Sequence, residues 1–252
     1  MRACYTAVAA VVAAALVSSA APAAEIKLIS VGGVKGALDK IIADYSKQSG
    51  NTVTYTVGSP LVVSQKLAAG DAFDVVVESA PAMDDYAKLG GVKADMRFKA
   101  VRGGIGMAVA PQATPPDIST AAAFKKTLLD VKSIAVGDPA MPNGSGILIQ
   151  AILKNSGLAD EIKPKVHVVG LDPGQQQIAK GEFEIGFFNI SEIRPFVKYA
   201  GPVPAPLQQY TNYDVAVTTK AAAGEAAMSL AKYIVGPDAQ AAWKSTGMEP
   251  SP

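Results

Sequence analysis

A repeated order of strand, glycine-containing turn and helix constrains this chain more than any other feature of its sequence. A short run typical of a strand lies at residues 26–30, and apolar residues then recur at helical spacing as far as Gly50. The same order returns at residues 53–70, and residues 74–77, an aspartate followed by three valines, are typical of a strand buried on both faces. Strands that alternate with helices in this way indicate parallel β-α-β units, so we predict an α/β fold.

A second set of strand and helix patterns follows after residue 102. Four segments typical of strands occur in it, at residues 105–110, 133–136, 166–169 and 185–188. Helical patterns separate these runs, the last of them at residues 175–179, and a further strand is expected at residues 213–218. A chain of 252 residues with this many strands fits two α/β lobes better than one sheet.

The first 23 residues are expected to be a signal peptide rather than part of the fold. Met1 and Arg2 give a positive start, and residues 7–17 form an uninterrupted run of apolar residues. This run is too short to span a bilayer, which needs roughly 20 apolar residues. The Ala-Pro-Ala segment at residues 21–23 is the best match to a signal peptidase site. We therefore expect export to the periplasm.

Charge and cysteine content exclude several classes of protein. The chain has 23 basic and 22 acidic residues, whereas a general nucleic-acid binder carries a basic excess. The single cysteine, Cys4, lies in the expected signal peptide, so the mature chain is expected to lack disulfides and thiolate metal sites. His167 is the only histidine, which argues against a zinc site and a Ser-His-Asp triad. We expect a monomer with no metal, cofactor, nucleic-acid partner or stable membrane insertion.

Three strand-to-helix turns contain the residue types that bind anions. They comprise Ser30, Gly32 and Gly33 in the first turn, Ser59 and Pro60 in the second, and Gly144, Ser145 and Gly146 in the third. A helix start presents unpaired N–H groups and a partial positive charge, glycine lets a ligand approach the backbone, and serine adds a hydroxyl donor. Such turns lie at the carboxyl ends of strands, where ligands usually bind. Serine and glycine also cap ordinary helices, so a purely structural interpretation stays open.

The order of several motifs along the chain resembles that of a known family. These motifs lie at residues 27–33, 54–60, 70–77, 138–146 and 236–240. Together they are similar to the periplasmic molybdate-binding proteins of ABC importers, over essentially the whole mature chain. The resemblance implies a type II periplasmic binding protein fold, with two α/β lobes, two crossover strands and a hinged cleft that holds the ligand. It places lobe 1 at residues 24–102 plus 213–252, and lobe 2 at residues 103–212.

Two positions depart from the pattern of that family. Molybdate-binding proteins usually carry serine where this chain has Gly33, and they favour a tyrosine in the segment that matches residues 187–192, which has none. The resemblance therefore supports the fold of this family more strongly than it supports molybdate as the ligand. The chain also resembles a branch of the family that includes periplasmic aconitate isomerases, which act on a small tricarboxylate. The expected ligand is a small anion, either a molybdate-like oxyanion or a small carboxylate.

Two functions from different classes stay open at this point, and the first is favoured. As the solute-binding protein of an ABC importer, the chain would close its lobes over the anion and deliver it to the transporter's membrane subunits. Neutral donors in a site without any acceptor would suit a fully ionised oxyanion. As an isomerase, the chain would shift a double bond by proton transfer, which needs a base and groups that stabilise the intermediate.

Charged and polar residues outside the turns complete the set of candidates. For the isomerase we name Lys35, Arg102 and Glu192 as candidate catalytic residues, and Lys35 and Arg102 are also candidate ligand-binding cations. Asn189 and Ser191 are further candidate ligand-binding residues. Lysine and arginine are usually solvated surface charges, and Glu192 also fits a carboxylate at a helix start, so these assignments have structural alternatives.

Overall fold

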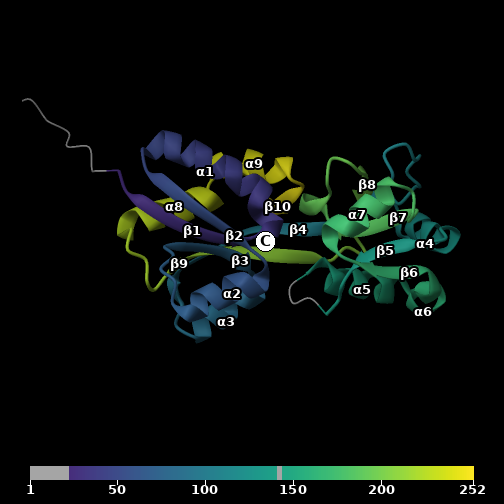
Figure 1. Cartoon of the computed structure of the whole chain (residues 1–252), viewed down its shortest axis with the longest axis horizontal. Helices are drawn as coiled ribbons and strands as arrows, with labels where there is room; N and C mark the ends of the chain where they lie inside the picture. Colours follow the sequence, from purple (N-terminus) through teal and green to yellow (C-terminus); the bar gives the residue numbers. More distant parts are fainter. Residues whose placement is uncertain (1–22, 141–143) are drawn as a thin grey trace, which may run out of the picture.

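The computed structural model describes residues 23–140 and 144–252, which form two α/β lobes at opposite ends of the long axis (Figure 1). The predicted signal peptide, apart from its last residue, lies outside the described residues. Within the described ranges, no helix is both long enough and apolar enough to cross a membrane. The two-lobed α/β architecture predicted from the sequence is confirmed.

Lobe 1 contains a sheet with the strand order β2-β1-β3-β9-β4. Its strands are β1 (Glu25–Val31), β2 (Thr52–Gly58), β3 (Val75–Ser79), β9 (Tyr210–Thr218), the first part of β4 (Val92–Val109) and β10 (Met248–Pro250). Its helices are η1 (Gly32–Val34), α1 (Lys35–Ser49), α2 (Pro60–Ala69), α3 (Ala80–Lys88), α8 (Gly224–Val235), η4 (Pro237–Ala239) and α9 (Gln240–Ser245). In Figure 1, α1, α8 and α9 lie on one side of the sheet, and α2 and α3 lie on the other. The strands β1, β2 and β3 are parallel, as predicted, whereas β9 is antiparallel to both of its neighbours.

Lobe 2 contains a smaller sheet that uses the second part of β4. Its other strands are β5 (Ile134–Gly137), β6 (Val166–Val169), β7 (Ile185–Asn189) and β8 (Lys198–Pro202). Its helices are α4 (Ala121–Asp130), α5 (Ser145–Ser156), α6 (Ala159–Ile162), η2 (Lys163–Lys165), α7 (Leu171–Ala179) and η3 (Ile190–Glu192). The strands β7, β5 and β6 are parallel, and β4 is antiparallel to β7 and β8.

The long strand β4 belongs to both lobes. Its residues as far as Gly104 pair with β9, and from Ile105 onward they pair with β7. Gln208 fixes the return of the chain, because its side chain accepts from the Ile105 N–H and donates to the Ile105 carbonyl, each at 2.9 Å. Lobe 2 is therefore inserted between β4 and β9. The lobe boundaries predicted at residues 102/103 and 212/213 lie close to these crossings and stay a prediction.

Each lobe buries its own hydrophobic core. In lobe 1, Val75, Val76 and Val77 are completely buried, as expected of a strand covered on both faces. Trp243 is also completely buried and donates its indole N–H to the Ile234 carbonyl at 2.9 Å. The helix α1 ends at Gly50, whose φ of 75° lies in the left-handed region that glycine adopts without steric cost. The core of lobe 2 is formed by two separate clusters of buried residues.

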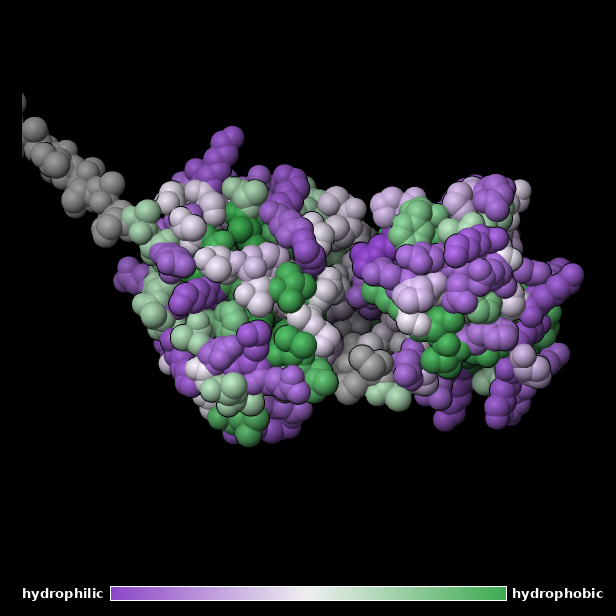
Figure 2. Space-filling model, in the orientation of Figure 1, coloured by the Kyte–Doolittle hydropathy of each residue, from purple (hydrophilic) through white to green (hydrophobic). Residues whose placement is uncertain are grey.

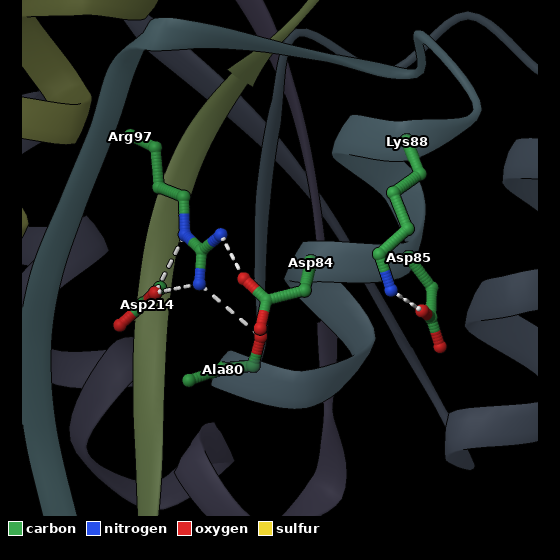
Figure 3. Close-up of polar contacts among 6 residues, drawn as sticks. All are labelled: Ala80, Asp84, Asp85, Lys88, Arg97 and Asp214. Carbon is green, nitrogen blue, oxygen red and sulfur yellow. Dashed lines mark hydrogen bonds and ion pairs between the residues drawn. The ribbon is translucent and has the colours of Figure 1, made fainter.

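A buried carboxylate ties β9 to β4 and α3 in lobe 1 (Figure 3). Asp214 on β9 is only 4% exposed, and Arg97 on β4 donates to it through Nε at 2.7 Å and through its terminal nitrogen at 2.6 Å. The same guanidinium contacts the Asp84 carboxylate at 2.6 Å and the Ala80 carbonyl at 3.2 Å, both on α3. The second pair drawn, between Lys88 and Asp85, is exposed, and such pairs contribute little to stability.

Candidate functional site

A cavity of about 880 Å³ lies between the two lobes, lined by residues from both of them. Figure 2 shows the molecule hollowed between the lobes. The lining comes mainly from residues at the carboxyl ends of β1, β2, β3, β5, β6 and β7 and from the helix starts that follow them. This is the position at which open α/β sheets usually bind ligands.

All three anion-type turns predicted from the sequence open onto this one cavity. Its lining includes Gly32 and Gly33 of η1, Ser59 and Pro60 at the start of α2, and Gly144, Ser145 and Gly146 at the start of α5. Because each helix start carries about half a positive charge, several partial charges of one sign converge on the cavity. Their role in binding stays a prediction, because the geometry alone identifies no ligand.

A fourth helix start, which the sequence analysis missed, also lines the cavity. Gly170 and Leu171 begin α7, whereas a helix was predicted only from Gln175 onward. Asp172 and Pro173 occupy the first turn, where an acidic residue and a proline are both typical. A glycine that follows directly on the strand at residues 166–169 was the available signal.

Ser59 caps its helix, and this structural role leaves its hydroxyl hydrogen unused. Its Oγ accepts from the Val62 N–H at 3.3 Å, and Pro60 occupies the first helical position, for which its fixed φ is suited. The capping bond uses only a lone pair of the oxygen, so the hydroxyl can still donate. Ser145 makes no such cap and is almost completely buried. The structural interpretation and the binding interpretation of Ser59 are therefore compatible.

Two other predicted serines do not line the cavity. Ser30 is completely buried, donates to the Val31 carbonyl at 3.0 Å and shares a hydrogen bond of 2.6 Å with the Tyr55 hydroxyl. Burial raises the pKa of Tyr55 to about 12, so this pair stays neutral. Ser191 is outside the lining as well, and its buried Oγ has no partner among the described residues.

The two predicted cations also lie outside the lining of the cavity. Lys35 pairs with Asp39 one turn further along α1, and both side chains are half-exposed. Arg102 pairs with Glu249 on β10 at 2.7 Å, and its guanidinium lies 4.1 Å from the centre of the Tyr210 ring. Among the described lining residues there is no lysine, arginine or histidine. His167 lies on β6 and packs against Phe183 instead.

Carboxyl groups line the cavity, so the acceptor-free site that would suit a fully ionised oxyanion is not what the described lining contains, and Glu192, a candidate from the sequence, is one of these groups. Glu192, on η3, accepts from the Asn189 amide at 2.8 Å, and burial raises the pKa of its carboxyl. Glu78, at the end of β3, is 1% exposed and accepts from the Ser79 N–H at 2.6 Å. Its Oε2 is buried with no partner among the described residues, and burial raises its pKa too. Asp138 is a third, exposed carboxylate on the lining.

The hydroxyl of Tyr213 completes this group, which we call the acid cluster (Glu78, Glu192 and Tyr213). All three members line the cavity. Burial raises the pKa of Tyr213, and the neighbouring charges of Glu192 and Glu78 raise it further. The phenol is therefore a neutral O–H group at neutral pH. A buried phenol beside two buried carboxyls is a group that can accept, donate or transfer protons.

Tyr213 also explains why glycine stands at position 33. A Cβ atom on Gly33 would lie 2.7 Å from the Tyr213 hydroxyl oxygen and 3.8 Å from Oε1 of Glu192. The tyrosine therefore occupies the space that a serine side chain would need. The segment at residues 187–192 has no tyrosine and instead buries Phe187 and Phe188. The phenol at this site comes from β9.

A Glu78→Gln variant tests the environment of the deepest carboxyl. The free carboxyl titrates near pH 4.5 and the folded one at a higher pH, so the folded chain holds its proton more tightly. The wild-type free energy of unfolding therefore falls as the pH rises from the pKa of the free carboxyl through that of the folded one. The variant has no carboxyl at this position and does not lose this free energy. Near pH 4 we expect equal melting temperatures for the wild type and the variant. At pH 8 we expect the variant to melt higher, by about 2–4 °C for each kcal/mol by which deprotonation of Glu78 destabilises the wild type. The exposed Glu182→Gln is the control, and a difference that does not change with pH would contradict the assignment.

Comparison with known proteins gives two relatives that span nearly the whole chain. Aconitate isomerase from Pseudomonas sp. is 30% identical over 242 residues, which cover 93% of this chain and 91% of the relative. The molybdate-binding protein ModA of Azotobacter vinelandii is 26% identical over 245 residues, with 93% of each chain covered. The solved structure of the Azotobacter vinelandii periplasmic molybdate-binding protein matches with a TM-score of 0.72 at 20% identity, over 90% of this chain and all of that one.

The family follows from a match that spans both lobes. The model of the bacterial extracellular solute-binding protein family matches residues 26–249, which include every lining residue named above. The two-lobed fold and the cavity between the lobes agree with this match. The chain belongs to the bacterial extracellular solute-binding protein family.

Proposed function

We propose that this protein is the periplasmic solute-binding protein of an ABC importer and that it holds a small anion between its lobes. The observation that carries the proposal is the convergence of four helix starts on one interlobe cavity. Unpaired backbone N–H groups at helix starts bind anions without any cationic side chain. The absence of lysine and arginine from the described lining is compatible with an anion for this reason.

The binding residues of this proposal are the turn residues that line the cavity. From the predicted set they are Gly32, Gly33, Ser59, Pro60, Gly144, Ser145, Gly146 and Asn189, and we add Gly170 and Leu171. Ser30, Lys35, Arg102 and Ser191 are left out, because none of them lines the cavity. The residues come from both lobes, so a bound ligand stabilises the closed arrangement in proportion to its additional contacts there. The membrane subunits of the importer would recognise that arrangement.

A thermal-shift panel tests the proposal directly. Purified protein is heated with molybdate, tungstate, sulfate, citrate, cis-aconitate or trans-aconitate. A ligand present at 100 times its Kd stabilises the folded state by about 2.7 kcal/mol, which corresponds to roughly 5–10 °C for a chain of this size. We expect at least one anion to give such a shift. If no anion raises the melting temperature, the proposed function is wrong.

A matched pair of cap variants separates ligand binding from helix capping. Ser59 caps α2 beside the cavity, and Thr120 caps α4 in the same way, with its Oγ1 accepting from the Ala123 N–H at 3.1 Å. Thr120 does not line the cavity. Ser59→Ala and Thr120→Ala are each expected to cost about 0.5–2 kcal/mol of stability.

Only Ser59→Ala is expected to weaken binding of the stabilising anion, by about tenfold or more, because it also removes a donor to a charged group. Isothermal titration calorimetry measures the affinity of both variants. Equal affinities would show that Ser59 acts only as a cap.

A second function is supported by the acid cluster and by the isomerase relative. Carboxyls whose pKa is raised toward neutrality suit general acid–base catalysis, and Glu192 and Glu78 are such groups on one cavity. Glu192 then removes the proton next to a carboxyl group of the tricarboxylate, while the helix starts stabilise the negative charge that develops. The double bond shifts, and the protonated Glu192 returns a proton to the carbon at its other end. NMR of trans-aconitate with catalytic amounts of protein tests this function. Turnover that Glu192→Gln abolishes supports it, and an unchanged spectrum excludes it.

A further inference from the structure

We propose that the ligand of this cavity is a small organic acid that carries a hydrogen-bond donor of its own, and that Glu192 and Glu78 accept from this donor. The inference rests on the proposed function, since it narrows the class of anion that the same site takes. The shared chemistry is one anionic group together with one O–H or N–H group. A hydroxy acid and an amino acid both meet this description, and the experiment below distinguishes them.

The first argument is that the lining of the cavity contains both hydrogen-bond donors and hydrogen-bond acceptors. Four helix starts offer backbone donors, whereas Glu78, Glu192 and Asn189 offer acceptors. Glu78 is 1% exposed, and its Oε2 has no partner among the described residues. The Oδ1 of Asn189 is likewise buried without a partner in the described ranges. Buried acceptors without donors are costly, so a donor of the ligand gains free energy where it reaches them. These two atoms have almost no accessible surface, whereas Glu192 is only partly buried and is the acceptor that a ligand in the cavity meets first.

The second argument is the exclusion of fully ionised oxyanions. Such an ion has acceptors only, and in this cavity it would face the carboxyl groups of Glu78, Glu192 and Asp138. No cation among the described lining residues offsets them. Like charges at close range in a partly buried site are strongly unfavourable, which makes the acid cluster an element that rejects the wrong ligand.

The third argument is the available space. A cavity of about 880 Å³ lies within the range of roughly 300–1,000 Å³ that is typical of sites for organic ligands. Gly33 leaves room for the Tyr213 hydroxyl of lobe 1 to stand beside Glu192 of lobe 2, so donor and acceptor groups from both lobes lie together in the cavity. The anionic group then lies against the helix starts, and the donor of the ligand points toward the acid cluster.

Matched pairs of small acids test the inference by isothermal titration calorimetry on the full mature chain. Malate and citrate each carry a hydroxyl that succinate and tricarballylate lack, aspartate carries an ammonium group that succinate lacks, and hydrogen phosphate carries a proton that sulfate lacks. We expect the donor-bearing member of at least one pair to bind about 10- to 100-fold more tightly. The hydroxyl pairs and the ammonium pair identify which donor the site takes.

The Glu192→Gln variant provides the decisive comparison. Its amide keeps an acceptor but loses the negative charge and adds a donor. We expect the preference for the donor-bearing acid to fall about tenfold or more, and binding of sulfate and molybdate to become stronger. Glu182→Gln, an exposed substitution, is expected to change neither.

The possible results separate this inference from the proposed function. If molybdate or sulfate binds wild-type protein more tightly than every donor-bearing acid, the inference is overturned while the proposed function stands. Equal affinities within all pairs overturn it in the same way. If no anion of either kind binds, the proposed function fails and the inference fails with it. Circular dichroism and melting temperature establish that Glu192→Gln is folded, and Glu78→Gln repeats the comparison at the second carboxyl.

Discussion

An Arg97→Met variant is expected to lose about 3–5 kcal/mol of its free energy of unfolding. The Asp214 carboxylate is 4% exposed and takes both of its charge-assisted hydrogen bonds from Arg97 (Figure 3). Methionine fills part of the space of the arginine stem but leaves that carboxylate in the interior without a counter-charge. Urea denaturation at pH 7 measures the loss.

Two further variants separate this buried pair from its exposed partner. Asp84 contacts the same guanidinium but is 57% exposed at its side chain, so Asp84→Asn is expected to cost less than about 1 kcal/mol. Adding Asp214→Asn to Arg97→Met removes the unpaired charge and is expected to restore a large part of the stability. A single Arg97→Met variant that loses under 1 kcal/mol would contradict this explanation.

A Gly146→Val variant is expected to abolish ligand binding, with an affinity reduced more than about 100-fold. A Cβ at position 146 would lie 2.4 Å from the carbonyl carbon of Asp138 and 2.6 Å from the carbonyl oxygen of Gly137. Both are backbone atoms at the end of β5, so the start of α5 has to move away from the end of that strand, and both segments line the cavity. Such overpacking typically costs about 1–3 kcal/mol of stability as well.

Gly32 offers a control on the same cavity. It also lines the cavity, but a Cβ there would meet no atom within 4 Å. Gly32→Ala is therefore expected to change the free energy of unfolding by less than about 0.5 kcal/mol and the affinity by less than about tenfold. Calorimetry with the most stabilising anion of the panel measures both variants. Full affinity in Gly146→Val would mean that the start of α5 takes no part in binding.

Much of the fold could be predicted because most of its strands have a recognisable local sequence pattern. The strand predicted at residues 74–77 contains three consecutive valines, and the three glycine-containing turns mark where strands give way to helices. The first part of β4 was not predicted, because its charged residues alternate with apolar ones and carry no continuous apolar run. A period of two along residues 92–100 was the signal that would have identified it.

The candidate site could be predicted only in part. The turns were found because helix starts have local signatures, whereas the placement of side chains depends on distant partners. The exclusion of Arg102 follows from Glu249, which lies 147 positions away in the sequence. The exclusion of Lys35 could have been anticipated, since Asp39 follows it at the spacing of a helical ion pair. Glu78 was missed although it stands at the carboxyl end of a predicted parallel strand.

The position of β9 between β3 and β4 has a consequence for how the chain acquires its structure. When a chain emerges with its N-terminus first, from a ribosome or a translocation pore, β3 and β4 appear long before Tyr210–Thr218. The edge of β3 that pairs with β9 has no partner strand until the residues of lobe 2 have also emerged. The lobe 1 sheet therefore cannot be completed from the first hundred residues alone. It folds fully only after Tyr210–Thr218 has emerged.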